Sequence, residues 1–104
     1  MSKEDDLDKK VNSPKDVYVL RLFITGTSAV SVRAINNLHA ILNQYLKDKY
    51  ELEIIDVHQQ PSMVKDDDVM AVPMLIKKYP FPKKRLVGDM SDINRVLKGL
   101  GVEQ

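Results

Sequence analysis

The stretch FITGTSAVSVRAINNL, residues 23–38, joins an apolar run to a helical pattern through the turn Gly26, Thr27 and Ser28. A turn between a strand and a helix is a common position for a phosphate site, a nucleophile or a redox cysteine pair. The chain has no cysteine, which excludes thiolate nucleophiles, thiolate-bound metals and dithiol redox chemistry. The turn has one glycine, whereas the dinucleotide-binding fingerprint needs three, and it has no Lys after that glycine as a phosphate-binding P-loop needs. The favoured interpretation of Ser28 and Ser31 is therefore helix capping, and we assign neither a catalytic residue nor a cofactor site.

Histidine and aspartate are the remaining candidates for metal chemistry. His39 lies in an expected helix and His58 follows an expected strand, with no third ligand at a recognised spacing. Asp66, Asp67 and Asp68 lack the alternating spacing and the distal Glu of a calcium loop. A solvated run of charge is the better interpretation, and the sequence predicts no metal site.

Five cations fall within nine residues, at Lys77, Lys78, Lys83, Lys84 and Arg85. A basic hairpin of this kind fits an acidic surface on a protein partner. Lysine and proline also protect edge strands against unwanted pairing, and both interpretations stay open. Nucleic acid is a weaker third choice, because the aromatic residues are too few for a base-stacking platform.

Composition and length indicate one soluble globular domain: 104 residues, a net charge of +1, 43% hydrophobic and 30% charged residues. Residues 1–16 hold four Lys and five acidic residues, so we expect a flexible charged tail, with a binding arm that folds on a partner as the alternative. Residues 17–104 form the expected domain. No apolar segment approaches the ~18 residues of a membrane span, and the N-terminus lacks the apolar core of a secretory signal. We expect a cytoplasmic protein that binds neither membrane nor nucleic acid.

The elements that position these residues follow from hydrophobic periodicity. We expect strands at 17–25, 50–57, 72–78 and 83–89, a helix from the Ser28 turn to about residue 47 or 49, a short helix or loop at 61–69, and a last helix that Ser91 caps and that Gly99 and Gly101 end. The first strand, helix and strand form a parallel βαβ unit. The order β-α-β-α-β-β-α with a mixed sheet is that of the α/β thioredoxin-like fold, in which Pro73 stands at the position of a cis-proline.

Several motifs occur in an order and spacing that resemble the KaiB family of small thioredoxin-like clock proteins: YVLRLFITG, SVRAINNLHAIL, YELEIIDV followed by QQP, AVPMLIKK and RLVGDMSD. The resemblance covers about residues 17–101. It implies a non-catalytic regulator that binds the N-terminal ring of a KaiC-type hexameric ATPase. It also implies fold switching between an oligomeric ground-state topology and a monomeric thioredoxin-like topology that binds the partner, with the switch beginning at about Gln60.

The resemblance further implies roles for single residues. Those implied in partner contact or in an oligomer interface are Tyr18, Arg33, Lys77, Lys84, Arg85 and Asp89. Gly88 and Gly99 correspond to positions that set the balance between the two topologies. We expect a homo-oligomer, dimer or tetramer, with the thioredoxin-like topology favoured.

Departures from the clock-type pattern favour a different role. Clock-type members carry Lys where Glu53 and Asp68 stand, and each change reverses a charge that contributes to partner contact. Those members also continue through an Asp at the position of Gly101, a Tyr and an acidic tail. These differences favour a diverged homologue that acts in stress adaptation without binding KaiC. A redox-inactive relic of a thioredoxin-like enzyme is a further alternative.

Overall fold

A computed structural model describes residues 17–102; the predicted tail at 1–16 lies outside the described residues. The elements are β1 (Tyr18–Ile24), α1 (Ala29–Tyr45), β2 (Tyr50–Asp56), α2 (Pro61–Asp66), β3 (Met74–Tyr79), β4 (Lys84–Val87) and α3 (Ile93–Leu100). The predicted order of strands and helices is confirmed, and the segment after Pro61 is a short helix.

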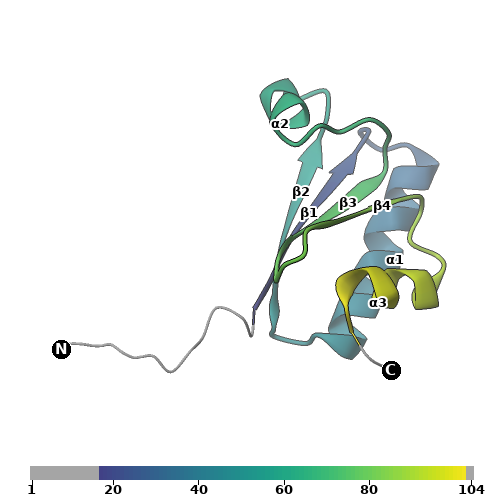
Figure 1. The fold of residues 1–104 in the computed structure, drawn as a ribbon. Helices are drawn as coiled ribbons and strands as arrows, with labels where there is room; N and C mark the ends of the chain where they lie inside the picture. The colour runs from purple at the N-terminus through teal and green to yellow at the C-terminus, as the bar shows by residue number, and fades with distance from the viewer. Residues whose placement is uncertain (1–16, 103–104) are drawn as a thin grey trace.

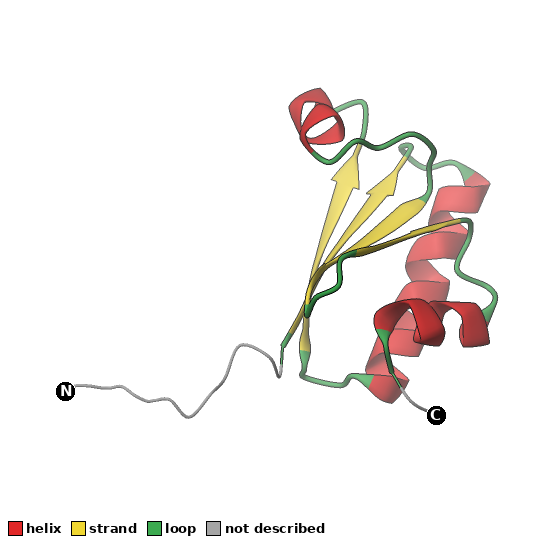
Figure 2. Cartoon of the chain, viewed as in Figure 1, coloured by secondary structure: helices red, strands yellow, loops and turns green. Residues whose placement is uncertain are grey.

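The four strands form one mixed sheet in the order β2-β1-β3-β4, which Figures 1 and 2 show from the side. β1 pairs with β2 in parallel, while β3 pairs antiparallel with both β1 and β4. α1 and α3 lie on one side of the sheet, and α2 lies beyond its other side, close to the end of β2 (Figure 1). The thioredoxin-like fold class predicted from the sequence is confirmed.

Alternation along the strands divides the apolar side chains between two cores of unequal size. The larger core lies between the sheet and helices α1 and α3, and its buried members include Leu20 and Leu22 of β1 with Leu38 and Leu42 of α1. The smaller core lies on the other face: Phe23, Ile55, Met74, Ile76. Only partly buried side chains of α2 and of the segment after it pack against this smaller core.

Local backbone chemistry explains where the elements begin and end. The Val72–Pro73 peptide bond is cis, at the position the sequence predicted, and β3 begins directly after it. α3 ends at Gly101, whose φ of 77° is a left-handed conformation that glycine adopts without strain. The prediction that Ser91 caps this helix is wrong, because the Asp92 side chain accepts the hydrogen bond from the amide of Arg95.

All four strands are shorter than predicted, and β4 differs most. β4 spans only Lys84–Val87, since the backbone turns at Gly88, where φ is 131°. None of the helices among residues 17–102 has the length and apolar character needed to cross a lipid bilayer.

Candidate partner-binding surface

The turn before α1 uses its hydroxyl groups to begin the helix. The Ser28 side chain accepts a hydrogen bond from the amide of Ser31 at 3.3 Å and donates one to Ser31 Oγ at 2.9 Å. Ser31 Oγ in turn accepts the amide hydrogen of Thr25 at 3.0 Å, and Ser31 is buried. Both hydroxyls therefore hold the βα turn closed, which confirms the capping interpretation.

A cluster of charged side chains covers the sheet face that α2 approaches. Asp67, the residue at which α2 ends, is only 6% exposed. Its carboxylate accepts hydrogen bonds from Arg21 of β1 at 2.7 Å and from Lys78 of β3 at 2.5 Å. Its backbone carbonyl accepts one from Arg85 of β4 at 2.9 Å, so this Asp67 cluster ties three strands to the end of one short helix.

The electrostatics of the cluster favour the ionised carboxylate. Burial alone would raise the pKa of Asp67, but hydrogen bonds from Lys78 and Arg21 outweigh it and hold that pKa below its ordinary value. Arg21 also donates to Glu53 of β2 at 3.1 Å. Because no residue of α2 itself is buried, these polar contacts at its C-terminal end carry much of its attachment to the sheet.

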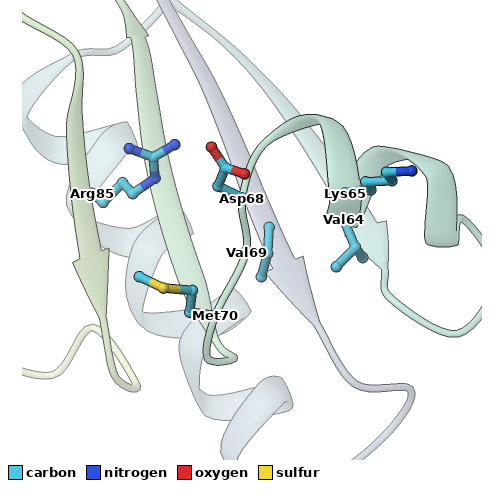
Figure 3. Close-up of a pocket in the computed structure, with 6 residues that line it drawn as sticks. All are labelled: Val64, Lys65, Asp68, Val69, Met70 and Arg85. Atoms are coloured by element: carbon cyan, nitrogen blue, oxygen red, sulfur yellow. The ribbon is translucent and has the colours of Figure 1, made fainter.

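An open depression adjoins this cluster, between α2 and β4 (Figure 3). Its volume is about 590 Å³, and its lining consists of Val64, Lys65, Asp68, Val69, Met70 and Arg85. We call it the Arg85 depression. Its valine and methionine side chains supply apolar surface, and Met70 is 86% exposed. An apolar floor with charges at the rim is a composition that protein interfaces share.

The basic residues predicted from the hairpin have different surroundings. Lys84 and Arg85 are exposed on β4, and Arg85 lines the depression. Lys77, in contrast, is only 4% exposed, and its Nζ lies 3.4 Å from the carbonyl of Leu100 at the end of α3. Burial, and then the charge of Lys84, lower the pKa of Lys77. The expectation that Lys77 offers a surface cation therefore does not hold for this topology.

Arg33 and Asp89, 56 positions apart in the chain, come together at the far side of the sheet. Arg33 Nε lies 3.4 Å from Asp89 Oδ2, and Asn37 donates to the Asp89 carbonyl at 2.9 Å. Hydrogen bonds from Ser91, followed by the contact with Arg33, hold the pKa of Asp89 below its ordinary value. The predicted site residues thus fall into two separate groups rather than one.

The remaining predicted residues lie within the fold. Tyr18 begins β1, is half-buried and packs against the larger core. Gly99 marks a close approach of α3 to β4, because a Cβ there would lie 2.7 Å from Leu86 Cδ1. Gly88 and Gly99 therefore both belong to the junction of β4 and α3. A change of packing in the second half of the chain would alter the surroundings of both glycines.

Sequence reasoning missed the Asp67 cluster. Arg21 was visible as the single charge in an otherwise apolar strand, and a charge in that position requires a partner when it is half-buried. The triple aspartate run was interpreted as solvated, although its central member is the buried one. No group of three or more His, Cys, Asp or Glu residues arranged for metal binding occurs within 17–102.

Solved structures similar to this chain define its fold class. The N-terminal domain of Synechococcus elongatus SasA matches with a TM-score of 0.71 at 22% identity, covering 93% of each chain. The thioredoxin Deadhead of Drosophila melanogaster matches with a TM-score of 0.67 at 12% identity, covering 85% of this chain and 82% of that one. At such identities the likeness concerns the fold alone, which is thioredoxin-like.

Sequence comparison then identifies the family. The family model described as "KaiB domain" matches residues 21–102. The circadian clock protein KaiB3 of a Synechocystis species is 46% identical over 84 residues, which is 81% of this chain and 82% of the relative. The circadian clock oscillator protein KaiB of Synechococcus elongatus is 40% identical over 88 residues, which is 85% of this chain and 86% of the relative. The chain belongs to the KaiB family.

Proposed function

We propose that this protein is a non-catalytic, cytoplasmic KaiB-type regulator that binds a KaiC-type hexameric ATPase in a clock or clock-derived system. The observation that carries the proposal is the family match over residues 21–102, to relatives named as circadian clock proteins. The engagement of Ser28 and Ser31 in helix capping supports a role without catalysis. The topology described here is the one that the family resemblance assigns to partner binding.

The Arg85 depression is the surface we assign to the ATPase. It combines apolar area from Val69 and Met70 with the cations of Lys65 and Arg85, and Lys84 lies next to it on β4. A partner surface with an apolar side chain and neighbouring carboxylates complements this arrangement. The Arg33–Asp89 pair forms a second, separate area, which we assign to contact with a partner or with another copy of the chain.

A second candidate function rests on the charge of Asp68. This exposed carboxylate lies at the rim of the same depression, where clock-type members carry Lys. A like charge opposite an acidic partner lowers affinity. The alternative is therefore a diverged KaiB-family protein that acts in stress adaptation without a KaiC-type partner. Glu53, the other reversed charge, has an internal role because it pairs with Arg21.

The two functions are separated by sedimentation velocity of the protein with the KaiC-type ATPase of its own host, in the presence of ATP. The first function predicts a complex that Arg85→Glu weakens and Asp68→Lys strengthens. Lys47→Glu is the matched control, because Lys47 is exposed just after the end of α1, and α1 lies on the other side of the sheet from α2 (Figure 1). Absence of a complex at tens of micromolar for the native chain and for Asp68→Lys would contradict the first function and favour the second.

Sedimentation velocity of the protein alone, compared with the runs that contain the ATPase, tests whether the protein forms an oligomer. A dimer or tetramer that dissociates when the ATPase is added supports the two-topology behaviour implied by the family resemblance. A monomer at every concentration contradicts an oligomeric ground state.

A further inference from the structure

The connection between β3 and β4, residues 79–83, presents an aromatic ring to solvent, and we call it the hairpin tip. Phe81 is 75% exposed. It contacts Tyr79 edge-on, with ring centroids 5.8 Å apart and an interplanar angle of 71°. Pro80 and Pro82 flank the ring, and their fixed φ angles reduce the conformational entropy that the tip loses on binding. A phenyl ring held in this way has the properties of an anchor in a contact between proteins.

A small depression lies near the tip, on the sheet face that carries the Asp67 cluster. Its volume is about 160 Å³, and its lining consists of Val19, Leu20, Arg21, Glu51, Leu52, Glu53 and Lys78. We call it the Val19 depression. Val19 pairs with Tyr79, and β1 and β2 both begin at the end of the sheet where the hairpin tip lies (Figure 2). Because a cavity of about 150 Å³ accommodates a benzene ring, the Val19 depression has the size for one phenyl side chain.

The hairpin tip and the Val19 depression carry charges of opposite sign. Glu51 lines the depression and Lys83 belongs to the tip; both are exposed, and within residues 17–102 neither forms an ion pair. The two cations in the lining of the depression, Arg21 and Lys78, both contact the carboxylate of Asp67. The depression therefore offers a partner the carboxylate of Glu51, whereas the tip offers the amine of Lys83.

The hairpin tip and the Val19 depression complement each other in size and in charge. Because they are neighbours on one surface, a two-fold axis between two copies of the chain places each tip on the other copy's depression, and such a contact closes at a dimer. We propose that two copies form this symmetric dimer, with Phe81 of each in the Val19 depression of the other and Lys83 of each beside Glu51 of the other. The dimer forms in the thioredoxin-like topology and does not require the KaiC-type ATPase.

Sedimentation velocity of the full chain over a range of concentrations tests the proposal. Lys83→Glu and Glu51→Lys each place like charges at both contacts of the dimer, so each is expected to raise the dissociation constant about tenfold or more. Phe81→Ala is expected to have an effect of similar size, because it removes the ring from both depressions. The matched control is Lys98→Glu, since Lys98 is exposed on α3, which lies on the other side of the sheet from the Val19 depression (Figure 1). The control is expected to dimerise as the native chain does.

Mixing the two charge variants tests which residues meet. In a pair made of one Lys83→Glu chain and one Glu51→Lys chain, both contacts join opposite charges, so the equimolar mixture is expected to dimerise about as well as the native chain. A contact within one chain gives no such rescue. A native chain that stays monomeric at millimolar concentration overturns the proposal. An oligomer that is unchanged by Lys83→Glu and by Phe81→Ala, or a mixture that stays dissociated, also overturns it.

Discussion

Replacing Asp67 with asparagine is the sharpest test of how α2 is attached to the sheet. The substitution keeps the size of the side chain and removes the charge that Arg21 and Lys78 contact at 2.7 and 2.5 Å. The carbonyl of the new side chain can still accept one hydrogen bond, but the second cation loses its partner. The bond from Arg85 to the backbone carbonyl of residue 67 is unaffected by the change.

The magnitude follows from the two charged hydrogen bonds and their exposure. Hydrogen bonds to charged groups contribute about 1.5–3 kcal/mol each, and the neutral bond that remains contributes about 1 kcal/mol. The side chains of Arg21 and Lys78 keep 25% and 24% of their area exposed, so water compensates part of the loss. The asparagine is also easier to bury than a carboxylate. We expect a net loss of about 2 kcal/mol in the free energy of unfolding.

Urea denaturation followed by circular dichroism measures this loss, with Asp66→Asn as the matched control. Asp66 precedes Asp67 in α2 and is exposed, so its replacement is expected to change stability by less than about 0.5 kcal/mol. For Asp67→Asn the midpoint is expected to fall by about 1 M urea. Native-state hydrogen exchange of the amides of Asp67 and Val69, which bond to the carbonyls of Met63 and Val64, is expected to accelerate more than that of β1.

The pH dependence provides a second readout with a defined sign. The pKa of Asp67 is lowered in the folded state, so its stabilising contribution is fully present above the unfolded value of about 3.9. That contribution is lost as the pH falls through the lower, folded pKa. Asp67→Asn is therefore expected to flatten the acid limb of the stability curve below about pH 4. Equal midpoints for Asp66→Asn and Asp67→Asn, or an unchanged acid limb, would refute the attachment of α2 through Asp67.

Three further substitutions have expected outcomes. Arg33→Ala is expected to leave the thermal unfolding midpoint almost unchanged, because its 3.4 Å contact with Asp89 is exposed; a clear drop in the midpoint would contradict a surface role. Lys77→Met is expected to leave stability unchanged or to raise it by about 1 kcal/mol, since the buried amine has a lowered pKa. It should also remove the gain in stability that the native chain shows as the pH rises through the folded pKa of Lys77 toward its unfolded value; a destabilised variant with the native alkaline profile would contradict this. The change in the free energy of unfolding caused by Gly99→Ala should be more favourable by about 1 kcal/mol or more in a Leu86→Ala background than in the native chain, because the smaller side chain at residue 86 removes the 2.7 Å contact. Additive effects of the two substitutions on the urea midpoint would contradict this.

Periodicity in the sequence was sufficient for the order of elements, because each signal lies within a short window. The continuous apolar run of β1 reflects a strand that is buried on both faces, with Leu22 in the larger core and Phe23 in the smaller one. The repeat of Leu38 and Leu42 in α1 reflects one buried face, and the structure buries both residues. The glycine at residue 101 ends α3 for the local reason that its φ is positive. Helix capping was predicted correctly at Ser28 and wrongly at Ser91, since Ser91 and Asp92 are adjacent and both side chains can cap.

The candidate site was harder to predict because its contacts join distant positions. Arg21 and Asp67 are 46 positions apart, and no local pattern shows that they meet. Lys77 could have been placed correctly, because it shares with Leu75 the face of β3 that lies under the helices. The five cations were interpreted as one basic hairpin, but the alternation of the strands sends Lys77 and Lys78 to opposite faces, one beside α3 and the other to Asp67.

The two faces of the sheet are therefore held by different forces, and this difference concerns the function. α1 buries aliphatic side chains in the larger core, so its removal from the sheet would expose large apolar areas to water. α2 has no fully buried residue: only the partly buried Met63 and Val64 pack against the smaller core, and directional contacts at Asp67 add to its attachment. Loss of those contacts needs only a competing partner for Arg21, Lys78 or Arg85, and Arg85 also faces the depression proposed to bind the ATPase. A partner carboxylate that recruits Arg85 would therefore act on the attachment of α2 as it binds, which couples binding at this surface to the arrangement of the second half of the chain.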